Sequence, residues 1–162
     1  MSTRVWQRED RTDLSLPEVA DRCAIRDLVD AYAQCADRRD VPGQMALFTE
    51  DVDFIVYADR GAPMPLQKLR GRAALARMCH QFDAYQAVTH INGQSTTRID
   101  GARASGVTFC LVCRVQTAGV ARTVMTTAVR YLDSYVKRHD TWLIRQRLVL
   151  IDWTDTRTLA PG

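Results

Sequence analysis

Four long stretches of β-forming residues in the C-terminal half constrain the fold of this chain more than any other feature. From about Gln86 onward the sequence alternates in polarity and is rich in Val, Thr, Ile and Tyr. Turn signals interrupt it at Asp100-Gly101, the strongest short hairpin signal present, at Thr117-Ala118-Gly119 and near His139-Asp140. The pattern predicts an antiparallel meander of strands over residues 86–99, 103–116, 121–137 and 141–154.

The N-terminal half has helical spacing instead. Ser15 and Glu18 match a capping box, and Pro17 suits the first turn of a helix. Apolar side chains then recur on one helical face, at Ile25, Leu28, Val29, Tyr32 and Ala36. This spacing predicts a helix that ends near Asp37.

Three further elements are expected before the meander. They are a short helix capped by Asp40 and running through Phe48, a strand over residues 52–58, and a helix that starts at Gly71 and carries Phe82. A loop containing Gly61, Pro63 and Pro65 separates the last two. Helices followed by an antiparallel meander predict an α+β fold, in which a long twisted sheet curls around the helices and leaves a cavity.

Length and charge narrow the class of protein. The chain has 162 residues, enough for one domain, which we expect over residues 15–156 with a polar arm at 1–14 and a tail at 157–162. A net charge of +3 without basic runs argues against a nucleic-acid partner. The odd count of five cysteines indicates free thiols, and neither a signal peptide nor a membrane span is evident. We therefore expect a cytoplasmic protein without a membrane partner.

His90 is the histidine best placed for chemistry. Strand alternation puts Val88, His90, Asn92 and Gln94 on one face, a polar row that suits the wall of a cavity. A single histidine on a strand is more often structural than catalytic. Both a catalytic and a structural role therefore stay open for His90. The other two histidines are His80, in the third predicted helix, and His139, in a charged turn.

Several segments resemble one family. The stretch DRCAIRDLVDAYAQCADRRDVPGQMALFTEDVDF is similar to the opening of SnoaL-like proteins, which belong to the nuclear-transport-factor-2-like superfamily. THINGQST and RYLDSYVKRHDTWLIRQRLVLIDW are similar to the strands of that family. The resemblance covers residues 17–154 and implies a cone-shaped α+β barrel with three N-terminal helices packed on a curved, mainly antiparallel sheet.

The resemblance also implies a site. Scytalone dehydratase, bile-acid 7α-dehydratase and hexachlorocyclohexane dehydrochlorinase, all of this superfamily, use an Asp–His pair, whose positions correspond to Asp37 and His90. Tyr32 matches the active-site Tyr of the bile-acid enzyme. In such a pair the carboxylate fixes the imidazole tautomer and stabilises its cation, while a buried phenol donates a hydrogen bond to a substrate oxygen.

Differences from the active-site residues of related enzymes narrow the range of reactions that we expect. Arg114 stands where scytalone dehydratase has a second histidine, so scytalone is a poor candidate substrate. The acidic residues of ketosteroid isomerases correspond to Val56 and to Arg130 or Tyr131, which does not support that chemistry. The Arg98-Ile99-Asp100 stretch mimics a limonene-epoxide hydrolase motif but lies one strand too early, beside a turn.

The resulting expectation is a lyase, most simply a dehydratase, or an isomerase that needs neither metal nor cofactor. It would act on a small apolar ring compound: a polyketide, steroid, terpenoid or aromatic catabolite. Catalysis would fall to His90, Asp37 and Tyr32, and substrate binding to Arg114, Asn92, Tyr57, Phe109, Tyr131 and Trp153. The alternative is a non-catalytic binding or accessory protein of the same fold. By analogy with related proteins, we expect a homo-oligomer, a dimer or a trimer.

Overall fold

A computed structural model describes residues 14–59, 61–118 and 121–160 of the chain. Nearly all of the polar arm, the end of the tail and Gly119 of the second predicted turn lie outside the described residues. Within them, no helix is long and apolar enough to cross a membrane.

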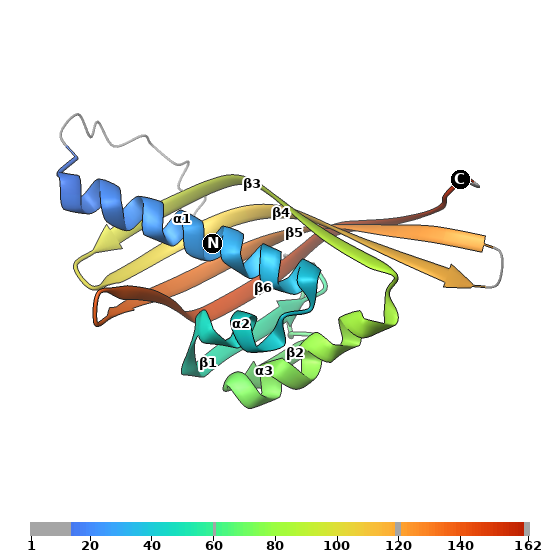
Figure 1. Cartoon of the computed structure of the whole chain (residues 1–162), viewed down its shortest axis with the longest axis horizontal. Helices are drawn as coiled ribbons and strands as arrows, with labels where there is room; N and C mark the ends of the chain where they lie inside the picture. The colour runs from blue at the N-terminus through green and yellow to red at the C-terminus, as the bar shows by residue number, and fades with distance from the viewer. Residues whose placement is uncertain (1–13, 60, 119–120, 161–162) are drawn as a thin grey trace.

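The described residues form a curved, open sheet with helices packed against it (Figure 1). The helical elements are α1 (Leu16–Arg38), α2 (Val41–Ala46), α3 (Arg72–Cys79) and a 3₁₀ turn, η1 (His80–Ala84). The strands are β1 (Phe48–Tyr57), β2 (Gln67–Arg70), β3 (Ala87–Asp100), β4 (Arg103–Ala118), β5 (Ala121–Arg138) and β6 (Thr141–Thr158). Their order in the sheet is β2-β1-β6-β5-β4-β3, and only the β1–β6 pair is parallel within the described part. The predicted α+β class is confirmed.

Helix α1 forms for the reasons that its sequence gives. The Ser15 hydroxyl accepts a hydrogen bond from the Glu18 N–H, which satisfies one of the free donors of the first turn. The helix ends one residue beyond Asp37, where Arg39 adopts a left-handed conformation with a φ of 57°. The predicted apolar face is the buried face, with Ile25, Leu28, Val29, Tyr32, Ala33 and Ala36.

Two elements near β1 differ from the sequence prediction. Strand β1 begins at Phe48 rather than at residue 52. Phe48 therefore belongs to the strand and not to the short helix expected before it, which ends at Ala46. Pairing with β6 extends β1 at its start, since Phe48 lies opposite Ile144. Strand β2 occupies part of the predicted loop, where Arg70 and its neighbours pair with β1.

The third predicted helix is shorter than expected. Helix α3 ends at Cys79, and His80 begins the η1 turn instead of lying in α3.

A β-bulge in β3 divides the polar row predicted on that strand. Asn92 lies opposite Cys110 but Ser95 lies opposite Thr108, so Gly93 and Gln94 share one partner position. The extra residue reverses the alternation beyond this point. Gln94 is therefore exposed, and the prediction that it shares a face with His90 is wrong.

The helices lie on one face of the sheet and define its inner side. Figure 1 shows α1 running across the long strands, with α2 and α3 beside it, while the β4–β5 hairpin extends past the helices. The core fills the space between the helices and the sheet, and its members include Tyr32, Phe48, Phe54, Tyr131, Trp142 and Ile144. The candidate site lies within this space, with Met78 of α3 and Phe82 of η1 in its wall.

Candidate active site

A cavity of about 180 Å³ lies between the inner face of the sheet and the helices. Alternation along the strands brings its walls together, as on β5, where Thr127, Val129 and Tyr131 point the same way. Most of the lining is apolar, and the full set is Tyr32, Phe54, Val56, Met78, Phe82, His90, Val112, Arg114, Thr127, Val129, Tyr131, Val149 and Ile151. The cavity therefore suits an apolar ligand with a small number of polar contacts.

His90 and Asp37 form a hydrogen-bonded pair at the wall of this cavity. Nδ1 of His90 lies 2.7 Å from Oδ1 of Asp37, and only 3% of the histidine side chain is exposed. A carboxylate accepts, so Nδ1 carries the proton in the neutral ring and Nε2 keeps its lone pair. The bonded Nδ1 leaves Nε2 as the nitrogen available to a ligand.

The pair forms because α1 covers the free edge of the sheet. Among the described residues, strand β3 is the last strand of the sheet, and no further strand pairs with its outward N–H groups. Both carboxylate oxygens of Asp37 accept from the backbone N–H of His90, at 3.0 and 3.1 Å. Asp37 therefore fixes both the backbone and the ring of the histidine.

Tyr32 lies one and a half turns before Asp37 on the same helix and lines the cavity. Its ring meets the His90 ring edge-on, with centroids 6.3 Å apart. Burial raises the pKa of Tyr32 to about 12. The phenol is therefore protonated at neutral pH and can donate a hydrogen bond.

A buried ion pair, to which no sequence pattern points, lies beneath the tyrosines. Arg147 donates two hydrogen bonds to Asp133, from Nε at 2.8 Å and from Nη2 at 2.7 Å, and both side chains are fully buried. Its guanidinium carbon lies 4.0 Å from the centroid of the Tyr32 ring and 4.2 Å from that of Tyr131. Burial opposes the charge of Arg147, but the adjacent Asp133 carboxylate outweighs it and raises the pKa of the guanidinium. The pair keeps both tyrosine rings in place.

Arg114 is the cation that lines the cavity itself. Its Nη2 donates to the Thr127 hydroxyl at 2.9 Å. The guanidinium carbon lies 6.0 Å from the Phe82 ring centroid and 5.8 Å from that of Tyr85. Its Nε is buried and has no hydrogen-bond partner in the described part of the chain.

The structure places Asn92 against α1 rather than in the cavity. Its Nδ2 donates to the Asp30 carboxylate at 2.9 Å and to the Val29 carbonyl at 3.3 Å. Asn92 shares the inward face of His90, but the helix covers it there. In the structure Asn92 therefore makes a contact between helix and strand and lies outside the cavity lining.

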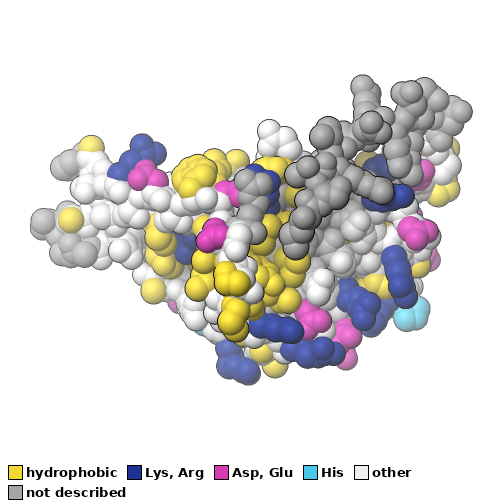
Figure 2. All heavy atoms as spheres, turned by 180° about the vertical axis from the view of Figure 1, so that it is seen from behind, with side chains coloured by type: hydrophobic (Ala, Val, Ile, Leu, Met, Phe, Trp, Pro, Cys, Tyr) yellow, Lys and Arg dark blue, Asp and Glu magenta, His cyan; other side chains and the backbone are white. Residues whose placement is uncertain are grey.

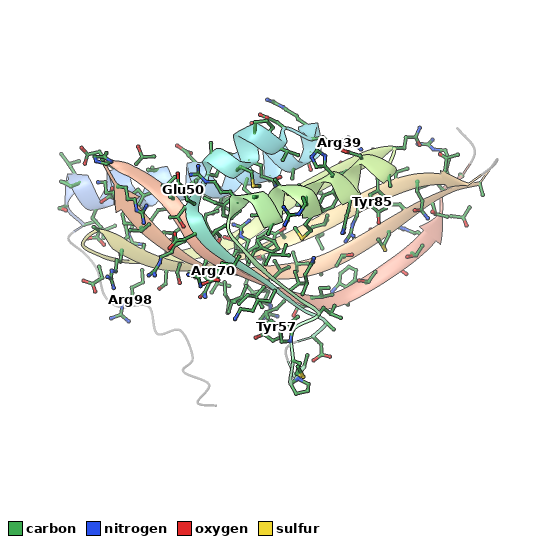
Figure 3. The ribbon with its side chains drawn as sticks, turned by 90° about the horizontal axis from the view of Figure 1, so that it is seen from below. Arg39, Glu50, Tyr57, Arg70, Tyr85 and Arg98 are labelled. Carbon is green, nitrogen blue, oxygen red and sulfur yellow. The ribbon has the colours of Figure 1, made fainter. Side chains whose placement is uncertain are left out.

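Tyr57, Phe109 and Trp153, three further residues expected to bind substrate, also lie outside the lining of this cavity. Tyr57 follows the cavity residue Val56, so alternation turns it to the other face, next to the loop after β1 (Figure 3). Phe109 packs on the outer face, where the Arg130 guanidinium lies 4.6 Å from its ring centroid. Trp153 is 51% exposed. Of the predicted substrate-binding residues, Arg114 and Tyr131 line the cavity.

The thiols and metal-binding side chains form no second centre among residues 14–59, 61–118 and 121–160, where no group of three or more potential metal ligands occurs. Burial raises the pKa values of the Cys79 and Cys110 thiols to about 11. Both are therefore protonated and unreactive at neutral pH.

Comparison with known proteins identifies the class. The SnoaL-like domain family matches residues 17–148, and the chain belongs to this family. The protein Rv2910c of Mycobacterium tuberculosis, whose function is uncharacterized, is 29% identical over 139 residues, which cover 86% of this chain and 90% of that protein.

Solved structures agree on the fold. A hexachlorocyclohexane dehydrochlorinase, LinA-type3 from Novosphingobium barchaimii, matches with a TM-score of 0.73 at 16% identity, covering 91% of this chain and 95% of that one. A candidate scytalone dehydratase from Novosphingobium aromaticivorans matches with a TM-score of 0.71 at 17% identity, covering 85% and 87%. The predicted membership of the SnoaL-like and nuclear-transport-factor-2-like superfamily is confirmed.

Proposed function

We propose that this protein is a cofactor-independent lyase that eliminates a small leaving group, such as water, from a ring compound by general acid–base catalysis; isomerisation is the related alternative. The observation that supports this most directly is the 2.7 Å bond between Asp37 and His90 at the wall of an apolar cavity. A base oriented by a carboxylate is the arrangement that proton abstraction from carbon requires. Related folds that carry dehydratase and dehydrochlorinase names lend further support.

In this mechanism Nε2 of His90 removes a proton from a ring carbon. The electrons of the C–H bond form a double bond as the neighbouring C–O or C–Cl bond breaks. Asp37 stabilises the imidazolium that results, because Nδ1–H already points at its carboxylate. Tyr32, with its proton retained, donates a hydrogen bond to the departing oxygen, and His90 returns its proton to hydroxide so that water is released.

The size of the cavity limits the substrate. A cavity of roughly 150 Å³ holds one benzene molecule. The cavity here, at about 180 Å³, fits a single ring with small substituents better than a steroid. We therefore favour monocyclic substrates among the classes that the sequence suggests.

The test is a turnover screen on single-ring compounds with a C–H vicinal to a hydroxyl or chloride, read by mass spectrometry as loss of water or HCl. For any compound converted, Asp37→Asn and His90→Gln should lower turnover by about 100- to 10,000-fold, the usual contribution of a general base. The chain offers a matched control, because His80 and Asp83 form an exposed pair 3.1 Å apart outside the cavity lining. His80→Gln should leave turnover unchanged, and full turnover in both cavity variants would overturn the proposal.

A second candidate function is non-catalytic binding of a small molecule. It is favoured by one observation: Asp37 also accepts from the backbone N–H of His90, which gives the carboxylate a structural role without chemistry. Under this reading, ligands from the same screen would be retained by the protein unchanged in mass.

Location and assembly belong to the same proposal. A cytoplasmic enzyme is consistent with five free cysteines and with the lack of a membrane-spanning helix in the described residues. Self-association is supported by an apolar outer face of the sheet, to which Ile91, Leu111 and Trp153 contribute.

A further inference from the structure

The end of the cavity that contains Arg114 carries a positive charge. Arg147 is neutralised by Asp133, and Asp37 lies behind His90, outside the lining. Arg114 lines the cavity, yet within the described residues it has no carboxylate partner, and no acidic side chain lines the cavity. Among the described residues of the lining, the Arg114 guanidinium therefore has no carboxylate with it.

Strand register places this cation close to the proposed base. His90 lies opposite Val112, and Arg114 follows two residues later on the same inward face, opposite Val88. Residues related in this diagonal way are about 7–8 Å apart on neighbouring strands. A molecule the size of one substituted ring can therefore reach both side chains at once.

The surroundings of Arg114 hold the guanidinium at this end. Its guanidinium carbon lies 6.0 Å from the Phe82 ring centroid and 5.8 Å from that of Tyr85. The Thr127 hydroxyl accepts a hydrogen bond from its Nη2. The Tyr85 carbonyl in turn accepts from the side chain of Arg39, which follows α1; Figure 3 labels Arg39 and Tyr85. Within the described residues, the buried Nε–H of Arg114 has no hydrogen-bond partner.

We propose that Arg114 and Thr127 form a carboxylate subsite, and that the substrate is a monocyclic carboxylic acid. This rests on the proposed function for the reaction, but not for the binding step. A guanidinium edge matches the two oxygens of a carboxylate, and Nε–H together with a terminal N–H supplies the two donors. The cavity has room for a single ring together with this small anionic group.

The experiment compares three probes of nearly equal shape: benzoate, benzamide and methyl benzoate, titrated by calorimetry or ligand-observed NMR. Benzoate should bind about 10- to 100-fold more tightly than the two neutral probes, as expected for hydrogen bonds to a charged group. Arg114→Gln should lower the affinity for benzoate to that for benzamide and leave the affinity for benzamide unchanged. Arg114→Lys should keep part of the preference, because it retains the charge without the planar edge.

Controls separate this subsite from a general effect of charge and from catalysis. Arg103→Gln, at an exposed position of β4, should leave all three affinities unchanged. His90→Ala should retain the benzoate preference whether or not His90 is the base, so failure of the proposed reaction leaves the subsite standing. Equal binding of benzoate and benzamide, no binding of either, or a preference that survives Arg114→Gln would overturn the subsite.

Discussion

Among single residues, the buried pair of Asp133 and Arg147 has the clearest energetic consequence. Removing the cation alone leaves a carboxylate buried beside the Tyr135 hydroxyl that donates to it. We expect Arg147→Met to lower the free energy of unfolding by about 3–5 kcal/mol, the usual cost of an unpaired buried charge. Urea denaturation measures this directly.

The double variant Arg147→Met/Asp133→Leu is the matched control. It removes both charges and replaces them with apolar side chains of similar size, so most of the lost stability should return. If the single variant costs less than about 1 kcal/mol, or if the double variant is less stable than the single one, this account of the pair is wrong.

The residues around the cavity differ in how far the sequence predicts them. A family resemblance points to Tyr32, Asp37 and His90, and the structure brings them together. No comparable sequence signal points to Arg147, because its pairing with Asp133 depends on strand register. Counting back from the Arg138–Thr141 pair without interruption would place Gln146 opposite Asp133, but a bulge in β6 shifts the pairing by one residue.

Among elements, the contact between α1 and β3 positions the catalytic candidates. Asn92 bonds to the middle of the helix, through the Asp30 side chain and the Val29 carbonyl. Asn92→Ala should lower the free energy of unfolding by about 1–3 kcal/mol, because one of these bonds is to a charged group. It should leave benzoate affinity unchanged, because Asn92 does not line the cavity.

Gln94→Ala provides the comparison for this prediction. Gln94 lies on the same strand but is exposed within the bulge, so its replacement should change stability by less than about 0.5 kcal/mol. Denaturation and probe titration of both variants separate the two roles of β3. A loss of benzoate affinity without loss of stability in Asn92→Ala would show that Asn92 contacts the ligand.

Elements with long, regular patterns were predictable, and short ones were not. The four strands of the meander follow from alternation and turn signals, although β6 continues to Thr158 rather than ending near residue 154. Strand β2 has the sequence QKLR, which lacks β-branched and aromatic residues, and it forms because β1 offers it an edge. Such an element depends on tertiary pairing, which a local pattern does not contain.

At the scale of the whole molecule, the two faces of the sheet differ in the side chains that they present. The inner face carries the cavity, whereas the outer face presents a row of apolar side chains across four adjacent strands. Pairing aligns this row: Ile91 is opposite Leu111, Leu111 is opposite Ala128, and Ala128 is opposite Trp153. Ile91 and Trp153 are 54% and 51% exposed. Figure 2, which shows the molecule from behind, has hydrophobic side chains gathered over the middle of that side.

This outer row leads to a prediction about assembly. Contiguous exposed apolar surface is unfavourable in water and often marks an interface, so we expect two or more copies of the chain to associate through it. Light scattering coupled to size-exclusion chromatography should give a multiple of the chain mass for the wild type. Leu111→Glu puts a charge at the centre of the row and should yield monomers, whereas Met64→Glu, at an exposed apolar residue of another segment, should not. A monomeric wild type, or an assembly that survives Leu111→Glu, would show that this face stays in solvent.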